Sequence, residues 1–338
     1  MSLDTIESSG HPLAFKMHKG KISDTVRGCT PSRDVFRVEA RMMAGHQKEV
    51  LVTEGDNGLV WRLTSDEGAI LKGTDLAPFP LAFFNAGLHA DFVNRIIFIA
   101  QSMGIVLVIN HIEITNKYYF QGSFFRGTGE GRAYAVTVHV DACSDSPRDQ
   151  VEAVLNLALI ASPAHAAMAF KQRNTFALYV NGRRCPVTRV ASSLKAVEID
   201  PFKVHRSAPV PLGEKEVSNV IIKRITHKLS GLLSPLFSVE GLVPIVIPGT
   251  SVLSNVSGLV ATTVTPQSGH AFCINCDESL DGGSAPSGLA CIAAAIAFCF
   301  MTQFSRYIEH RKHKVRAIRF IQTLPFTLAR DGLDAALV

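Results

Sequence analysis

The sequence lacks an apolar run long enough to cross a membrane. Its longest run, residues 289–301, is followed closely by the polar residues Gln303, Ser305 and Arg306, and it is shorter than the roughly 20 residues that a membrane-spanning helix needs. A run of this length predicts a buried core helix. The N-terminal segment also lacks the apolar core of a secretory signal, so we expect no membrane association and a cytoplasmic protein.

Cysteine and charge are both sparse. Seven cysteines are spread over 338 residues, and an odd, scattered set argues against a disulfide framework and for a reducing compartment. Charged residues make up 19% of the chain and the formal net charge is only +5, so we expect no nucleic-acid partner. Hydrophobic residues make up 47%, which excludes a disordered chain and supplies a large core.

The first half of the sequence alternates between strand-like and helical patterns after a polar extension at 1–33. Short runs rich in β-branched residues, bounded by Gly, Asp or Asn, predict strands. Apolar residues at three- and four-residue spacing between Leu81 and Ile99 predict a long helix. The segment 144–163, with a proline near its start, predicts a second helix. The predicted strands are 35–43, 49–55, 59–65, 105–114, 133–143 and 175–182.

A proline-rich connection at 186–212 separates this first unit, residues 34–185, from a second unit at 213–338. In the second unit we expect a helix at 214–235 and a long helix that begins at Ala285. Strands are expected at 242–247, 257–264, 270–275 and 314–324. The sequence therefore predicts an α+β protein made of two units of similar length.

Two internal matches relate the units to each other. Residues 77–92, APFPLAFFNAGLHADF, align without a gap with 285–300, APSGLACIAAAIAFCF, and place Asp91 opposite Cys299. A weaker match relates LIASP in the first unit to GLLSP in the second. The two pairs occur in opposite order along the chain. The second unit is therefore interpreted as a circularly permuted copy of the first.

The repeated helix and the segments after it resemble the OsmC/Ohr family, the osmotically inducible and organic-hydroperoxide-resistance proteins. The pattern APxxLAxxxAxxxA, followed by a reactive position and Phe, resembles the first long helix of that family. GSFFRGTGEG (122–131) and SDSPRDQVEAVLNLALIASP (144–163) resemble its next loop and second helix. These segments cover most of 35–185, and DGGSAPSGLACIAAAIAFCF (281–300) adds a second match.

This resemblance implies a specific fold and chemistry. Family members form intertwined dimers in which strongly bent sheets wrap around two buried helices, so a tandem chain is expected to form a pseudo-dimer within one polypeptide. Two facing cysteines, assisted by an arginine and a glutamate, reduce organic hydroperoxides in the family. We expect neither a cofactor nor a metal.

The sequence departs from the family at the reactive positions. The first-helix cysteine position is Asp91 in one unit and Cys299 in the other. The second-helix position is Ser162 in one unit and, if the permutation holds, Ser234 in the other. Because no complete cysteine pair remains, the peroxidase activity of the family does not carry over unchanged.

The assisting residues of the family are replaced or unassigned. The glutamate that usually follows the helix-start proline is Phe79 or Ser287. Arg41 and Arg126 are the candidates for the activating arginine. The glycine-rich segment around Arg126 lacks the Lys-Ser/Thr ending of a phosphate-binding loop, so it predicts a structural turn.

Cys299 is the sharpest candidate for chemistry. A cysteine reacts as its thiolate, which needs a nearby cation, base or helix N-terminus. None of these is adjacent to Cys299 in the sequence, so an activator has to come from elsewhere in the fold. The alternative is that Cys299 is a small buried hydrophobe.

Asp91 and His89 are polar residues in an otherwise apolar helical segment. A buried carboxyl group is costly unless it is paired or protonated, and such groups often perform acid–base chemistry. The alternative is that Asp91 is exposed or pairs with Arg95 one turn later. His89 is the weaker candidate, because residues two apart do not share a helix face.

Cys273 and Cys276 have the spacing of a redox dithiol or of half a zinc site. They lie at a strand end rather than at a helix N-terminus, where a redox pair gains its low pKa. Two unrelated cysteines are the simpler interpretation, although the pair would also suit a resolving thiol for Cys299.

Three functions stay open at this point. A thiol-dependent enzyme would act through Cys299 on a small apolar hydroperoxide or another electrophile. A cofactor-free hydrolase, lyase or isomerase would use Asp91 in a pocket between the long helices. A non-catalytic protein would bind a small apolar ligand between the same helices. The sequence does not decide whether the chain forms homo-oligomers.

Overall fold

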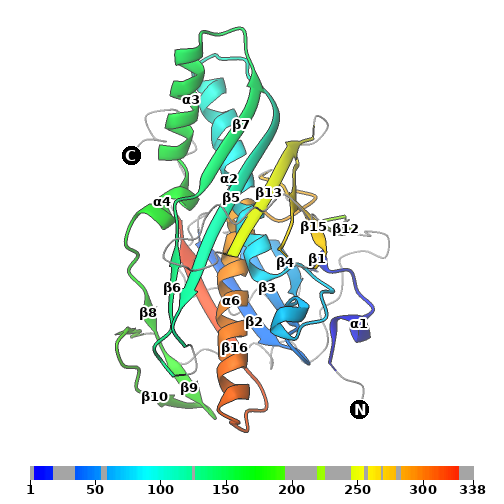
Figure 1. Cartoon of the computed structure of the whole chain (residues 1–338), viewed down its shortest axis with the longest axis vertical. Helices are drawn as coiled ribbons and strands as arrows, with labels where there is room; N and C mark the ends of the chain where they lie inside the picture. Colours follow the sequence, from blue (N-terminus) through cyan, green and yellow to red (C-terminus); the bar gives the residue numbers. More distant parts are fainter. Residues whose placement is uncertain are drawn as a thin grey trace.

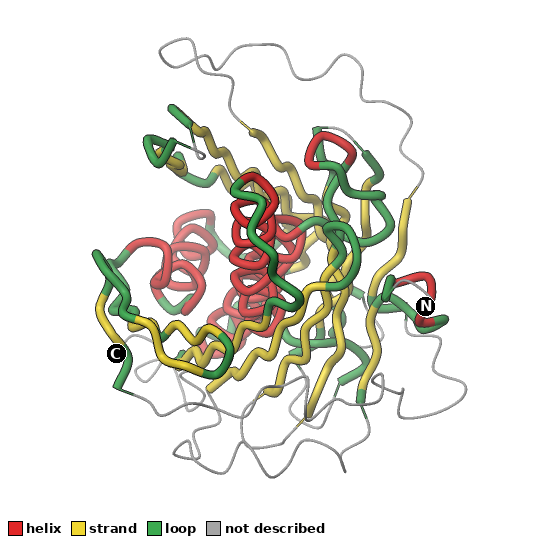
Figure 2. Tube along the Cα trace, turned by 90° about the horizontal axis from the view of Figure 1, so that it is seen from below, coloured by secondary structure: helices red, strands yellow, loops and turns green. Residues whose placement is uncertain are grey.

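Two long helices lie side by side at the centre of the molecule, with curved strands around them (Figures 1 and 2). They are α2 (Pro80–Ser102) and α6 (Gly288–His310), and they match the two long helices that the sequence predicts. The computed structural model describes residues 4–17, 35–54, 59–123, 126–194, 219–224, 245–254, 258–267, 269–278 and 283–326. The α+β class is confirmed.

The first large sheet has five antiparallel strands in the order β1-β4-β3-β2-β16. Its strands are β1 (Ala14–Lys16), β2 (Val35–Met42), β3 (Lys48–Glu54), β4 (Leu59–Ser65) and β16 (Arg319–Pro325). Alternate residues of β2, namely Phe36, Val38 and Ala40, belong to the main core. The strand that follows α6 thus completes a sheet that begins in the first unit.

The second large sheet has seven strands, in the order β12-β15-β14-β13-β5-β6, with β7 also paired to β5. Its strands are β5 (Val108–Gln121), β6 (Glu130–Ala133), β7 (Thr137–Cys143), β12 (Ile221–Arg224), β13 (Ile245–Leu253), β14 (Val260–Val264) and β15 (Ala271–Cys276). Ile112 and Ile114 of β5 and Ile247 of β13 are buried on the face toward the core. Strands of both units therefore also meet in this sheet.

The described elements follow the same order in both units. In the first unit β2, β3 and β4 precede α2 and β5, and in the second unit β13, β14 and β15 precede α6 and β16. The two units are joined by the pairing of β2 with β16 and of β5 with β13. This direct order gives the proposed permutation no support, and Ser234, on which it rested, lies outside the described residues.

A strand occupies the middle of one predicted helix. The segment 214–235 has helical spacing, but Ile221–Arg224 form β12, in which Ile222 pairs with Cys273 of β15. The β-branched residues of this segment suit a strand, and pairing with the open edge of β15 outweighs the helical pattern. The parts 214–218 and 225–235 lie outside the described residues.

The two long helices approach closely because small residues line their contact. A Cβ atom on Gly87 of α2 would lie 2.5 Å from the carbonyl oxygen of Gly288 and from Cγ1 of Ile292, both on α6. A Cβ atom on Gly288 would lie 2.8 Å from that of Ala90. These distances are too short for a side chain, so glycine is required on both sides of the crossing.

The smaller elements surround this core (Figure 1). They are α1 (Ile6–Ser9), the 3-10 helix η2 (Ala69–Leu71), α3 (Arg148–Ile160), α4 (Pro163–Ala169), β8 (Thr175–Phe176), β9 (Leu178–Val180), β10 (Arg183–Cys185) and β11 (Ala191–Ser192). Helices α3 and α4 both pack against α2. The single helix predicted at 144–163 is therefore two helices, because Ser162 caps a new helix at Pro163 instead of ending the old one.

By length and composition alone, α6 is apolar enough to cross a membrane, but 67% of its apolar window is buried inside the protein. The pair α3 and α4 meets the same criterion only if two helices bent by 66° are counted as one span. The burial of α6 agrees with the core helix predicted from residues 289–301.

Candidate functional site

An Asp-Glu pair follows the last strand before each long helix. Asp66 and Glu67 come directly after β4, and Asp277 and Glu278 directly after β15. Asp66 accepts a hydrogen bond from the hydroxyl of Thr74, eight residues downstream, at 2.6 Å. Asp277 accepts one from the N–H of Ser284, seven residues downstream, at 2.8 Å. The two pairs therefore occupy similar places, each between a strand end and one of the two long helices. The sequence analysis missed them, because acidic residues at a strand end usually belong to a solvated turn.

The Glu278 carboxyl group lies where α6 begins against α2. Its Oε1 accepts the N–H of Gly288 at 2.7 Å. Gly288 packs so tightly on α2 that a Cβ atom there would lie 3.0 Å from the backbone nitrogen of Asp91. The negative charge of Asp91 acts on Glu278 and raises its pKa. Glu278 and Asp91 thus belong to one polar region between the helices.

The Asp91 carboxyl group joins α2 to the start of α4. Its Oδ2 accepts the hydroxyl of Ser162 at 2.5 Å and the N–H of Ala164 at 3.3 Å. Ser162 is 3% exposed, and its Oγ accepts the N–H of His165 as the cap of α4. The structure therefore brings together Asp91 and Ser162, the two residues that the resemblance assigns to the cysteine positions of the first unit.

Desolvation dominates the electrostatics of this region. Burial raises the pKa of Asp91, although the Ser162 hydrogen bond and the positive charge of Arg95 oppose the shift. Burial also raises the pKa of Glu278 to about 7, and the charge of Asp91 adds to this effect. Glu54 accepts the N–H of Ser287 at 3.1 Å, and burial raises its pKa to about 8. Three carboxyl groups here favour the neutral form more than exposed carboxyl groups do.

This arrangement is suited to proton transfer. A carboxyl group with a pKa near 7 exists in both forms at neutral pH, so Glu278 can accept or donate a proton without a large free-energy cost. Arg95 lies one helical turn after Asp91 and contributes positive charge to both carboxyl groups. Arg95 and Glu278 keep partial solvent exposure, whereas Asp91 is only 3% exposed.

His89 faces the second large sheet rather than Asp91. Its Nδ1 lies 2.8 Å from Oγ of Ser251 on β13, and burial lowers its pKa to about 3, so the imidazole is neutral. Asn85, one turn earlier, donates to the carbonyl of Ile114 and to the side chain of Asn116. These contacts connect α2 to the sheet. His89 and Asp91 are two residues apart and therefore lie on different faces of the helix, as expected.

Cys299, which the sequence alignment places opposite Asp91, lies on α6 among different neighbours. Burial raises the pKa of its thiol to about 12, the charge of Glu67 adds to the rise, and that of Lys48 opposes it. Lys48 is fully buried and donates to Glu67 at 2.6 Å and to Thr302 at 2.8 Å. The hydroxyl of Thr302 donates to Glu67 at 2.5 Å. Lys48, the cation that opposes the rise in the thiol pKa, is thus already neutralised by a carboxylate.

The two cysteines of the CxxC motif do not contact each other. Residues three apart on a strand point to opposite faces, and the thiol of Cys273 lies 3.8 Å from the side-chain oxygen of Asn275. Cys276 instead lies 3.6 Å from Cys291 of α6, measured between the sulfur atoms. The sequence pattern could not reveal this partner, because Cys291 belongs to another element.

Neither predicted arginine lies at these sites. Arg41 pairs with Asp4 and Glu49 in the first large sheet. Arg126 is exposed in the turn between β5 and β6, which agrees with the structural turn predicted there. The cations that act on the two equivalent positions are Arg95 for Asp91 and Lys48 for Cys299.

No group of three or more His, Cys, Asp or Glu side chains in the described parts of the chain is arranged to hold a metal ion. Near the CxxC motif, Cys276 and Cys291 bring two thiols together, which is too few ligands for a metal site. The carboxyl groups around α6 are instead occupied by helix N–H groups.

Comparison with known proteins finds a partial likeness to a solved structure. No protein-family model and no curated protein matches the chain. A solved structure of an OsmC-like hydroperoxide resistance protein from Jannaschia sp. CCS1 aligns with 18% identity, over 44% of this chain and 95% of that one, with a TM-score of 0.28. A superposition at this score does not establish a family, so the sites are interpreted from their own residues.

Proposed function

We propose that this chain is a cofactor-free enzyme that transfers protons through the carboxyl groups of Asp91 and Glu278. The observation that carries the proposal is the pair of desolvated carboxyl groups at the crossing of α2 and α6, one of which has a pKa of about 7. Raised carboxyl pKa values at neutral pH are a property of general acids and bases.

The two carboxyl groups have different roles in this proposal. Glu278 alternates between its two protonation states and removes or returns a proton, because its pKa lies near neutral pH. Asp91 is held by Ser162 and by the start of α4, so it orients the substrate and tunes the pKa of Glu278. Arg95 stabilises negative charge that develops on the substrate. Proton abstraction, elimination and ester hydrolysis can all use this combination.

The structural frame of the proposal is a pseudo-dimer within one chain. It is supported by the equal element order of the two units, by the strands exchanged between the sheets and by the central packing of α2 on α6. The Asp-Glu pairs extend this relation to the loops before the helices. In this frame the two sites are equivalent in position and have diverged in chemistry.

A thiol-dependent enzyme acting through Cys299 is the second candidate. One observation favours it: Lys48 lies close enough to lower the pKa of the thiol. Burial and Glu67 outweigh this effect and hold the pKa at about 12. Because hydroperoxides react with the thiolate and not with the thiol, this site would need the Lys48–Glu67 pair to open before it could turn over.

Activity assays on matched variants separate the two candidates. We would measure deuterium exchange into small ketones, hydrolysis of p-nitrophenyl esters and reduction of cumene hydroperoxide. The proposal predicts that exchange or hydrolysis follows a pH profile with a midpoint near 7, that Glu278→Gln and Asp91→Asn abolish it, and that Cys299→Ser leaves it unchanged. Hydroperoxide turnover that is lost only in Cys299→Ser would favour the second candidate. Proton-transfer activity that survives in both carboxyl variants would rule out the first.

The binding alternative makes a different prediction. A protein that binds a small apolar ligand without chemistry would show none of the three activities, and native mass spectrometry would detect a ligand that Phe83→Ala removes. Phe83 is fully buried between the helices, where it contacts Phe298 with ring centroids 5.3 Å apart.

A further inference from the structure

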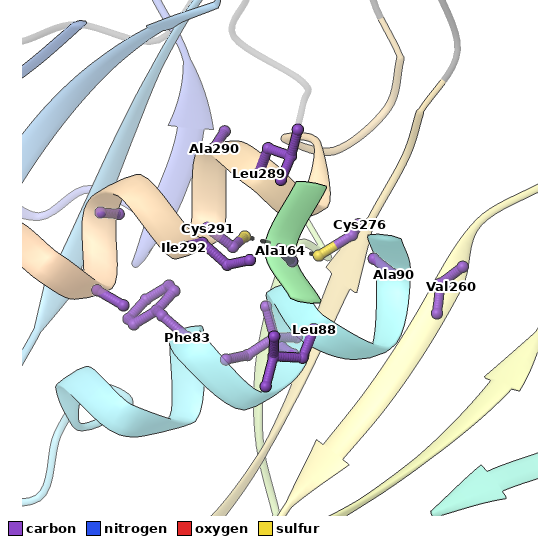
Figure 3. Close-up of a cluster of buried hydrophobic side chains, with 14 of the residues drawn as sticks. Phe83, Leu88, Ala90, Ala164, Val260, Cys276, Leu289, Ala290, Cys291 and Ile292 are labelled. Atoms are coloured by element: carbon purple, nitrogen blue, oxygen red, sulfur yellow. Dashed lines mark hydrogen bonds between the residues drawn. The ribbon is translucent and has the colours of Figure 1, made fainter. Parts of the chain in front are cut away.

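Two cysteine thiols meet beside the proposed acid–base site. Cys276 is the last residue of β15 and Cys291 lies in the first turn of α6. Their sulfur atoms are 3.6 Å apart and both residues are fully buried. Figure 3 shows the two side chains pointing toward each other, with Ala164 of α4 beside them.

The local backbone holds the two cysteines in this position. The N–H of Asp277, next to Cys276, donates to the carbonyl of Pro286 at 3.1 Å, which returns the chain to the strand end just before α6 begins. Cys291 then donates its own N–H to Ser287 at 3.1 Å, within the first helical turn. The contact between Cys276 and Cys291 is therefore held by the end of β15 and the start of α6, and not by a surface loop.

We propose that Cys276 and Cys291 are a redox pair that closes to a disulfide when a small hydroperoxide enters the core. Both sulfur atoms already face each other, so closure needs the separation to fall from 3.6 Å to about 2 Å. The site is distinct from Cys299, which lies two helical turns further along α6.

The chemistry balances with the hydroperoxide as the only oxidant. One sulfur, as its thiolate, attacks the outer peroxide oxygen and forms a sulfenic acid, and the alkoxide that leaves takes up the released proton as an alcohol. The second sulfur attacks the sulfenic sulfur, and the hydroxyl leaves as water with the proton of the second thiol. Two thiols are oxidised and one hydroperoxide is reduced to an alcohol and water.

The surroundings make this closure slow and dependent on pH. The neighbouring Cys291 thiol, burial and the charges of Glu278 and Glu54 all raise the pKa of Cys276 well above its usual value. The thiolate is therefore scarce at neutral pH, and the rate of closure rises as the pH increases. Once formed, the bond spans a loop that carries Asp277 and Glu278, so it restrains the start of α6 relative to β15.

The first test is mass mapping of the reduced full-length protein after exposure to hydrogen peroxide or tert-butyl hydroperoxide at pH 7 and pH 9. We expect a Cys276–Cys291 linked peptide, the loss of these two thiols in the peptide map and faster linkage at pH 9. Dithiothreitol should reverse the link. Overoxidation of Cys276 without a linked peptide, or no link at pH 9 after prolonged exposure that has fully oxidised Cys143, would overturn the proposal. Cys143 is exposed and serves as an internal control for oxidant.

Variants make the test independent of the acid–base proposal. Cys276→Ser and Cys291→Ala should each abolish the link, whereas Cys273→Ser and Glu278→Gln should retain it. Hydrogen exchange of the Gly288 amide should slow in the oxidised wild type and stay unchanged in Cys291→Ala. Linkage that persists in Cys291→Ala, through another cysteine, would assign the reaction to a different pair. Loss of proton-transfer activity in Glu278→Gln together with normal linkage would separate the two proposals.

Discussion

Asp91 on α2 and Cys299 on α6, which the alignment of the two Ala-Pro segments places opposite each other, have different electrostatic settings. At Asp91 the nearby loop contributes the Glu278 carboxyl group, and desolvation raises the pKa of both acids. At Cys299 the equivalent glutamate, Glu67, is bound by Lys48 and Thr302. One site therefore keeps a carboxyl group, Glu278, that titrates near neutral pH, while the other holds a buried ion pair. Similar sequence segments thus place side chains in different settings, and the neighbours of each side chain fix its chemistry.

We expect the largest effect on stability when the buried cation near Cys299 is removed. Lys48→Met leaves Glu67 buried without its charged partner, which should cost about 3–5 kcal/mol of the free energy of unfolding. Urea denaturation would measure the loss, and adding Glu67→Gln should recover much of it. Lys72, paired with Glu309 at the surface, is the matched control, and Lys72→Met should cost several-fold less. Equal effects of the two substitutions would show that the buried pair is not special.

The contrast also depends on the close crossing of the helices. Gly87→Ala should destabilise the protein by about 1–3 kcal/mol, because the new Cβ atom would lie 2.5 Å from a backbone oxygen of α6. Thermal denaturation would detect this change. Gly131→Ala is the control, since the nearest atom to a Cβ there is 3.8 Å away. A Gly87→Ala protein as stable as the control would mean that the helices do not approach as described.

The carboxyl site should make stability fall as the pH rises. Because burial raises the folded-state pKa of Glu278 from 4.5 to about 7, the folded state holds a proton that the unfolded state releases between these values. Stability linked to Glu278 is therefore present below about pH 4.5 and is lost as the pH rises to about 7. The loss should be about 1–2 kcal/mol after allowing for partial exposure.

Urea midpoints at pH 5 and pH 8 measure this effect. Glu278→Gln retains an oxygen for the Gly288 N–H and removes the titration, so its stability should decline less than that of the wild type over this range. Glu130→Gln, an exposed control on β6, should follow the wild type. A larger decline in Glu278→Gln than in the wild type would contradict the sign of the expected shift.

The smallest expected difference concerns the two serine caps. Ser162 caps α4 and also donates to the buried Asp91 at 2.5 Å. Ser287 caps α6 through the N–H of Ala290, and its side chain also interacts with Glu54. Ser287→Ala should cost about 1 kcal/mol as a lost cap, and Ser162→Ala somewhat more, because Asp91 also loses a donor. Denaturant midpoints of both variants at pH 6 would test the order, and a larger loss in Ser287→Ala would reverse it.

The sequence predicted much of the scaffold and little of the site. Helical spacing and the repeated Ala-Pro segment predicted α2 and α6, and β-branched runs predicted most strands. The helix predicted at 214–235 is wrong at Ile221–Arg224, which form a strand paired with β15. Pairing with a distant strand is a tertiary interaction, and the local spacing of apolar residues does not reveal it. Ser162 was found only through the resemblance to a family, whereas Asp91 also stood out as a carboxyl group in an apolar helical segment.

The remaining site residues were hidden for physical reasons. Glu278 looks like a solvated loop residue in the sequence, and its raised pKa arises from burial against α2. The spacing of Cys276 and Cys273 suggested either a thiol pair or two unrelated cysteines, and it could not show that Cys276 contacts Cys291 on another element. The pKa of Cys299 depends on Lys48 and Glu67, which are distant in sequence. The pKa of Glu278, the partner of Cys276 and the pKa of Cys299 all depend on contacts between different secondary-structure elements.

The most direct test of the central claim is the pKa of Glu278 in the folded protein. Carbon-detected NMR of side-chain carboxyl groups, assigned with Glu278→Gln, would follow its titration between pH 4 and pH 9. The account predicts a midpoint of about 7, which moves downward in Asp91→Asn because the neighbouring negative charge is removed. A midpoint below 5 that does not respond to Asp91→Asn would contradict it.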